Sequence, residues 1–283
     1  MHSLIQLSPL VRRITAPNPG PMTSAGTNTY LVGTDEIAVI DPGPAVDSHI
    51  EAILAACDGK LKWVVVTHTH PDHSPATQAL IAATGAQPVG LVMPDDGHQD
   101  TTFQVAKNIE DGEILAAQGF NLQAIYTPGH VGNHVCYLLK EEGVLFAGDH
   151  IFGGGSVVII PPSGDMKAYL ESLEKLKEYP VTAIAPGHGD VMQHPDVVIN
   201  SLIAHRLKRE QKVLEKMAEL GEASLDKLLP AVYDDVDSRL HRIARYSLWA
   251  HLLKLEKDGV AVKTIDRHWA FGEEHWQISG NRP

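Results

Sequence analysis

The feature that most constrains this chain is the segment Thr67–His73, which places three histidines and one aspartate within six residues. The apolar run Trp63-Val64-Val65-Val66 directly precedes it and predicts a buried strand that carries these residues at its C-terminal end. Because alternate residues of an extended strand point the same way, His68 and His70 can face one point in space. After Pro71 turns the chain, Asp72 and His73 can face another. Neutral imidazoles and carboxylates suit Zn²⁺, and also Mn²⁺ or Fe.

The same pattern of an apolar strand, a turn and a metal-competent side chain recurs three times. It ends at His130, at Asp149 and at His188. Only one of His130 and the nearby His134 is needed as a ligand. If His130 is that ligand, His134 could brace the loop or stabilise an oxyanion, and we favour bracing. Asp41 ends another apolar run, 37–40. It either caps its own turn or serves as the hydrogen-bond partner of a metal-binding histidine.

Composition sets the class of protein. At 283 residues, with 43% hydrophobic and 20% charged residues, the chain can form two globular domains. No apolar run reaches the roughly 20 residues of a membrane span, and the first residues do not resemble a secretion signal. Two cysteines cannot form a disulfide framework. We therefore expect a cytoplasmic protein without a membrane partner. The net charge of −12 disfavours purely electrostatic binding of nucleic acid.

The pattern of elements divides the chain at about residue 195. Residues 1–195 read as a catalytic domain, with predicted strands at 1–16, 28–32 and 37–40 and predicted helices at 48–57, 74–83 and 165–179. Ser74 is the expected N-cap of the second helix. Residues 196–283 predict helices at 202–220, 224–233 and 238–257, then a hairpin from 260–262 and 268–271. That order is typical of a winged helix.

The role of this tail has two interpretations. It could contact nucleic acid through Arg239, His241, Arg242 and Arg245, or it could be a packing module that supports a homodimer. Residues 201–263 carry 12 Lys/Arg and 10 Asp/Glu, so the tail is nearly neutral. The near-neutral charge and the acids that precede the third helix favour packing.

The ligand series resembles the metallo-β-lactamase superfamily, over roughly residues 10–195. The resemblance implies an α/β fold, an αββα sandwich with the site at one edge between two sheets. It implies that His68, His70 and His130 hold one metal ion. It also implies that Asp72, His73 and His188 hold a second ion, and that Asp149 bridges the two.

Further residues narrow the resemblance. Asn18–Thr23 and Gly26–Gly33, together with the helical tail, are similar to the β-lactamase-like protein 2 branch. Members of that branch end in a winged-helix-like domain, and some cleave single-stranded RNA, whereas other relatives act on thioesters or lactones. β-Lactamases of the thiolate type have cysteine where Asp149 stands.

We therefore expect a metal-dependent hydrolase that is not a true β-lactamase and that holds two divalent ions. Zn²⁺ is the ion that we expect first. A metal-activated hydroxide would attack an ester, thioester, lactone or phosphodiester bond. Asp72 would orient the water or relay its proton. The expected substrate is a small acyl compound or single-stranded RNA. The alternative is a non-catalytic metal-binding regulator that recognises nucleic acid through its tail.

Overall fold

A six-stranded sheet forms the N-terminal half of the fold in the computed structural model, which describes residues 3–153, 155–265 and 274–280. Its strands lie in chain order: β1 (Ile5–Gln6), β2 (Val11–Thr15), β3 (Asn28–Val32), β4 (Ile37–Ile40), β5 (Leu61–Val65) and β6 (Gln87–Val89). The first four strands are antiparallel, and β4, β5 and β6 are parallel because α1 (Asp47–Cys57) and α2 (Thr77–Thr84) connect them. Side chains alternate, so Leu31, Val39 and Val64 pack with Ile53 of α1 and Leu80 of α2 on one face.

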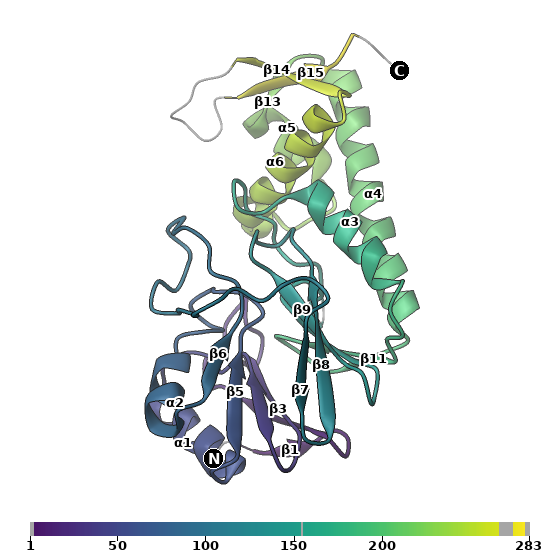
Figure 1. Cartoon of the computed structure of the whole chain (residues 1–283). Helices are drawn as coiled ribbons and strands as arrows, with labels where there is room; N and C mark the ends of the chain where they lie inside the picture. The colour runs from purple at the N-terminus through teal and green to yellow at the C-terminus, as the bar shows by residue number, and fades with distance from the viewer. Residues whose placement is uncertain (1–2, 154, 266–273, 281–283) are drawn as a thin grey trace. The chain divides into compact units, whose positions relative to one another are not determined.

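The other face of this sheet packs against a second six-stranded sheet (Figure 1). That sheet has the order β12-β11-β10-β9-β8-β7. Its strands are β7 (Ile114–Ala117), β8 (Phe120–Tyr126), β9 (Val135–Leu139), β10 (Val144–Gly148), β11 (Ala183–Pro186) and β12 (Met192–Gln193). Trp63 meets Phe120 edge-on with the ring centroids 6.5 Å apart, and the ring centroids of Tyr30 and Phe146 lie 5.1 Å apart. The two sheets therefore form a β-sandwich with one apolar core between them.

Helix α3 (Met166–Leu176) connects β10 to β11 in the chain. The elements that follow β12 form a second core. They are α4 (Pro195–Leu220), β13 (Ala223–Ser224), α5 (Leu225–Val232), the 3₁₀ turn η1 (Ser238–Leu240), α6 (His241–Lys257), β14 (Ala261–Ile265) and β15 (His275–Ile278). Leu225, Leu248 and Trp276 are buried together, and β13, β15 and β14 pair as a three-stranded sheet. Helices followed by a small sheet are the layout of a winged helix. Among the described residues, no helix has the length and apolar character needed to cross a membrane.

The contacts of the chain divide it into two units. The first comprises Met1–Pro128, Gly132–Val157 and Lys175–Asp196, and the second comprises Gly129–Val131, Val158–Glu174 and Val197–Pro283. The chain passes into the C-terminal segment between residues 196 and 197, next to the boundary expected from the sequence. Two earlier segments, 129–131 and 158–174, also belong to the second unit.

Several local predictions need correction. Helix α2 begins at Thr77 with Ala76 at its N-cap, because the Ser74 hydroxyl instead donates to Asp100 Oδ2 at 2.6 Å. The strand predicted over 1–16 consists of the two short strands β1 and β2. Helix α4 begins at Pro195, a residue that suits the first helical position, and not at 202. The hairpin strand predicted at 268–271 lies outside the described residues, and β14 pairs with β15.

The inter-sheet core predicts the effect of a cavity. Leu122 is fully buried in it, so Leu122→Ala should lower the free energy of unfolding of the first unit by about 2–5 kcal/mol. Ile114 of β7 is 44% exposed, and Ile114→Ala should change that free energy by no more than about 0.5 kcal/mol. Urea denaturation followed by circular dichroism measures both. Equal losses would contradict the assignment of Leu122 to the core.

Candidate metal centre

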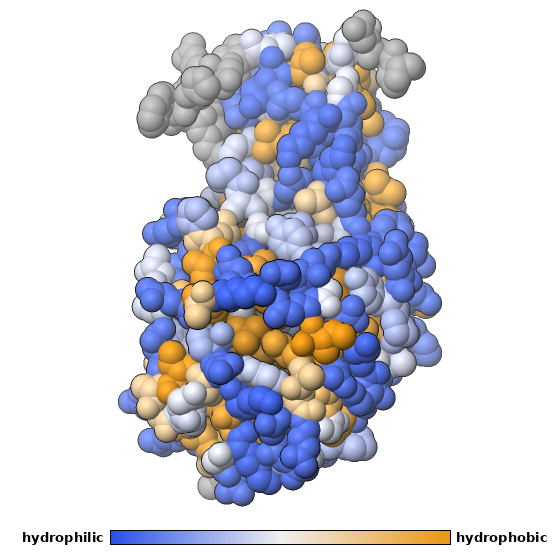
Figure 2. Space-filling model, in the orientation of Figure 1, coloured by the Kyte–Doolittle hydropathy of each residue, from blue (hydrophilic) through white to orange (hydrophobic). Residues whose placement is uncertain are grey.

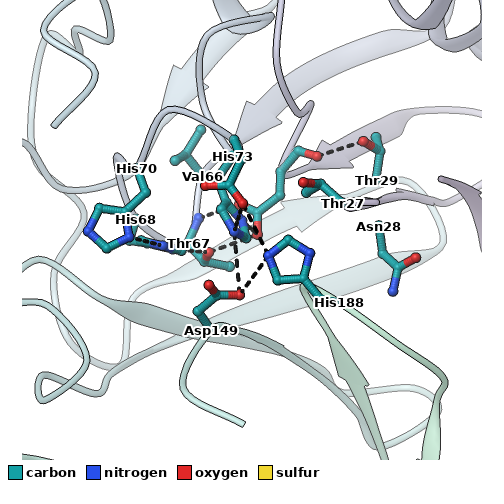
Figure 3. Close-up of polar contacts among 12 residues, drawn as sticks. Thr27, Asn28, Thr29, Val66, Thr67, His68, His70, His73, Asp149 and His188 are labelled. Carbon is teal, nitrogen blue, oxygen red and sulfur yellow. Dashed lines mark hydrogen bonds and ion pairs between the residues drawn. The ribbon is translucent and has the colours of Figure 1, made fainter. Parts of the chain in front are cut away.

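The predicted ligands in the first unit all follow strand ends. His68 to His73 follow β5, Asp149 follows β10, and His188 follows β11 after one glycine. Asp41 follows β4, which is parallel to β5, while β10 is parallel to β11. The carboxyl ends of parallel neighbours meet at one edge, so these side chains converge there (Figure 3).

One group of candidate ligands joins two imidazoles to two carboxylates. His188 Nε2 lies 3.1 Å from Asp72 Oδ2 and 3.3 Å from Asp149 Oδ1. His73 Nε2 lies 3.5 Å and 3.4 Å from the same two oxygens. Both Nε2 atoms are buried and neither forms a hydrogen bond with the described residues. A cation at this point would satisfy both nitrogens, and Asp72, His73 and His188 each offer a ligand atom within 4.8 Å of one another.

A second group overlaps the first and shares His73 and Asp149 with it. His68, His73 and Asp149 also offer ligand atoms within 4.8 Å of one another. His68 Nε2 lies 3.0 Å from His70 Nδ1 (Figure 3). Burial and the neighbouring His73 and His70 rings hold the pKa of His68 well below its usual value, so its ring is neutral. Neutral imidazole is the form that donates a lone pair to a metal.

His130 belongs to the second unit, on the turn that follows β8. Its Nδ1 lies 2.8 Å from the carbonyl oxygen of Val158. A carbonyl only accepts, so Nδ1 carries the proton and Nε2 carries the lone pair. That tautomer suits ligation through Nε2, and the role of His130 as the third ligand beside His68 and His70 stays a prediction.

Asp41 orients this cluster through hydrogen bonds to Thr67 and His73. It is buried, and its Oδ1 accepts from Thr67 N at 2.7 Å while its Oδ2 accepts from Thr67 Oγ1 at 2.8 Å. Oδ2 also lies 3.0 Å from His73 Nδ1. Because Nδ1–H donates to this carboxylate, Nε2 points toward Asp72 and Asp149, where a cation could replace its proton. Of the two roles considered for Asp41, the geometry favours the partner of a metal-binding histidine.

Other residues hold the remaining rings, and most of these contacts have no signature in the sequence. His134 is buried with Nδ1 3.0 Å from Thr127 Oγ1, and its ring stacks on His68 with the centroids 5.2 Å apart, which favours bracing. His188 Nδ1 lies 3.3 Å from the carbonyl oxygen of Gly26. A backbone carbonyl has no signature in the sequence. The Gly26 carbonyl could have been found only from the antiparallel bridge between its neighbour Thr27 and His188.

Two glycines leave room for the cluster. A Cβ on Gly187 would lie 2.7 Å from Asp149 Oδ1 and 2.7 Å from His73 Cε1. Gly148 has φ +46°, and a Cβ there would lie 2.4 Å from Thr67 Oγ1. A side chain at either position would displace a candidate ligand or the residue that supports it.

Opposite charges dominate the electrostatics of the group. Burial alone would raise the pKa of Asp149, but His73 and His188 hold that pKa well below its usual range. Burial alone would lower the pKa of His188, but Asp149 and Asp72 outweigh it and raise the value to about 9. Burial alone would also lower the pKa of His73, but the carboxylates of Asp72, Asp149 and Asp41 outweigh it and raise that pKa well above its usual value. The carboxylates are therefore ionised at neutral pH, and the two charged imidazoles would each release a proton when a cation binds.

Comparison with known proteins identifies the class. The family model of the metallo-beta-lactamase superfamily matches residues 23–188, more than half of the chain. The model of the beta-lactamase associated winged helix domain matches residues 224–269. The chain therefore belongs to the metallo-β-lactamase superfamily, and the predicted fold class, an α/β sandwich followed by a winged helix, is confirmed.

Particular relatives are similar over nearly the whole chain. A beta-lactamase-like protein 2 homolog of Caenorhabditis elegans is 34% identical over 263 residues, which cover 90% of this chain and 87% of the relative. An atrochrysone carboxyl ACP thioesterase of Aspergillus chevalieri is 30% identical over 98% of this chain and 89% of its own. A beta-lactamase domain protein from Burkholderia ambifaria, 21% identical, has the same fold with a TM-score of 0.79 over 98% of this chain and 95% of its own. The predicted resemblance to the β-lactamase-like protein 2 branch is confirmed, and the chain is a hydrolase of the superfamily rather than a true β-lactamase.

The contacts of Asp41 predict its effect on metal affinity. Asp41→Asn keeps a residue type that tolerates φ +49° but removes the charge that fixes His73. We expect metal affinity to fall about 10- to 100-fold, as for other hydrogen-bond partners of metal ligands. Competition with a chelating dye measures it. Asp35→Asn, in the exposed turn after β3, is the matched control, and an equal affinity for both variants would contradict the orienting role.

Proposed function

We propose that this protein is a hydrolase with two divalent cations, Zn²⁺ in the first place, that cleaves the thioester or ester bond of a small acyl substrate. The observation that carries the proposal is the convergence of His73 Nε2 and His188 Nε2 on the carboxylates of Asp72 and Asp149. Such a set of imidazole and carboxylate donors suits zinc. Asp72, His73 and His188 would hold one ion. His68, His70 and His130 would hold the other, with Asp149 shared between them.

Bound cations of this kind lower the pKa of a water molecule and polarise the substrate oxygen. The protein groups then have separate tasks. Asp41 fixes His73, and the Gly26 carbonyl fixes His188. Asp72 is the most exposed carboxylate of the group, with 29% of its side chain accessible against 16% for Asp149. Asp72 is therefore the residue best placed to accept a hydrogen bond from the attacking water and to orient it.

An acyl substrate is favoured over a nucleic acid by charge. The chain carries a net charge of −12, which repels a polyanion. In the winged helix, Arg239 pairs with Asp237 and Arg245 pairs with Asp226, so two of the arginines proposed for phosphate contact are already partnered. The relative from Aspergillus chevalieri that spans 98% of this chain is named a thioesterase. Single-stranded RNA is the second candidate, supported by the winged helix domain itself.

A non-catalytic regulator is the less economical alternative. A protein that only recognised nucleic acid would have no need for two carboxylates and two buried imidazoles around one point. Their retention, together with the orienting contact from Asp41, supports catalysis.

A hydrolysis panel tests the proposed function. We expect the zinc-loaded protein to cleave N-acetylcysteamine thioesters, to lose this activity after dialysis against a chelator, and to recover it with added zinc. Asp149→Ala should lower metal content and activity together, because it removes the shared ligand. Asp35→Asn, in the exposed turn after β3 and outside the candidate ligand set, is the control. Full activity in Asp149→Ala with one ion per chain would contradict the two-metal centre.

Replacing the winged-helix arginines separates the two substrate classes. Arg239, Arg242 and Arg245 changed together to alanine should leave thioester hydrolysis within about twofold of the unmodified protein, because none of the three lies in the first unit. Cleavage of a single-stranded oligoribonucleotide is measured in the same preparation at physiological salt. RNA cleavage by the unmodified protein that disappears in the triple variant would make RNA the better reading.

A further inference from the structure

A pocket of about 350 Å³ opens on the first unit. It lies between the loop after β6, the loop before β7, the end of β8 and the turn before β9. Ile109 and Val135 belong to the buried inter-sheet core and line the pocket, while Leu91, Val92 and Met93 line it from the loop after β6. Figure 2 shows hydrophobic side chains gathered at the surface over the region of β6 to β9.

The pocket is tied to the metal-ligand loop by one residue. Asn133 lines the pocket and is buried. Its Nδ2 donates to Thr69 Oγ1 at 2.7 Å and to the Leu91 carbonyl oxygen at 3.0 Å. Thr69 stands between His68 and His70, so a group in this pocket lies next to the loop that carries two candidate ligands.

The lining residues define the ligand chemistry. None of them is Lys, Arg or His, so the pocket offers no cation to a phosphate or a carboxylate. Its two acids are partnered from outside the lining, Asp111 by Lys175 at 2.8 Å and Glu110 by Lys107 at 3.0 Å. The volume falls in the range of small-molecule sites, and the apolar part of the lining, Leu91 to Met93 with Ile109 and Val135, suits an uncharged chain.

We propose that this pocket is the subsite for the aliphatic acyl chain of the substrate. The inference rests on the proposed hydrolysis of acyl substrates and adds the part of the substrate that is recognised. Burial of the chain against Leu91, Met93 and Val135 supplies binding energy in proportion to its length. The acyl carbonyl then lies on the side of Asn133 and Thr69, toward the metal-ligand loop.

A chain-length series tests the subsite. With N-acetylcysteamine thioesters from acetyl to octanoyl, KM should fall about fourfold for each buried methylene, which corresponds to about 0.8 kcal/mol. The double variant Val92→Asn with Met93→Gln should flatten this dependence, so that KM for the octanoyl thioester rises toward KM for the acetyl thioester. The control Ile114→Asn changes an apolar residue that is 44% exposed and outside the pocket, and it should keep the full dependence. A KM that is independent of chain length in the unmodified protein would overturn the subsite while leaving the hydrolase proposal intact.

If no thioester is hydrolysed, the proposed function is rejected but the pocket assignment is not. A binding measurement then tests the pocket by itself. Saturation-transfer NMR with 1-octanol reports whether an uncharged aliphatic chain binds the metal-free protein. We expect a signal from the unmodified protein and from Ile114→Asn, and at least a tenfold weaker Kd for the double variant. Equal binding by all three proteins, or binding by none, would overturn the pocket assignment.

Discussion

The buried carboxylate of Asp41 is the interaction on which the arrangement of the site depends. A buried charge costs several kcal/mol unless hydrogen bonds replace its hydration. Here the two oxygens accept from Thr67 N, Thr67 Oγ1 and His73 Nδ1 at 2.7–3.0 Å. These contacts join the end of β4 to the loop after β5. They also fix the rotation of His73, and through it the point at which Asp72, Asp149 and His188 meet.

Much of this arrangement is readable from the sequence, because it rests on local patterns. Strands β3 and β4 have the predicted bounds, since apolar runs with turn residues between them leave little freedom. The ligands after β5, β10 and β11 converge because parallel strands share an edge. The prediction of Ser74 as the N-cap of α2 is wrong because a serine next to a proline resembles a helix cap. The partner of its hydroxyl, Asp100, is 26 residues away. The sequence alone leaves the role of Asp41 open, because its contact with His73 spans 32 residues.

The winged-helix unit shows why a domain type does not settle function. Its basic residues are largely engaged within the unit. Arg209 stacks on Tyr233 with 4.4 Å to the ring centroid and pairs with Asp235, while Lys212 pairs with Asp234. On α6, Lys254 shares Glu210 with the buried His251. These pairs stabilise the unit and reduce the positive charge that a nucleic acid would meet.

We propose that the cluster at the strand ends is a two-metal centre organised by Asp41. Anomalous diffraction at the zinc absorption edge, from crystals grown with zinc, tests it most directly. We predict two peaks that share Asp149, one of them about 2.0–2.2 Å from His73 Nε2, His188 Nε2 and a carboxylate oxygen of Asp72. A single peak, or two peaks that both lie beyond ligand distance of His73 and His188, would contradict it.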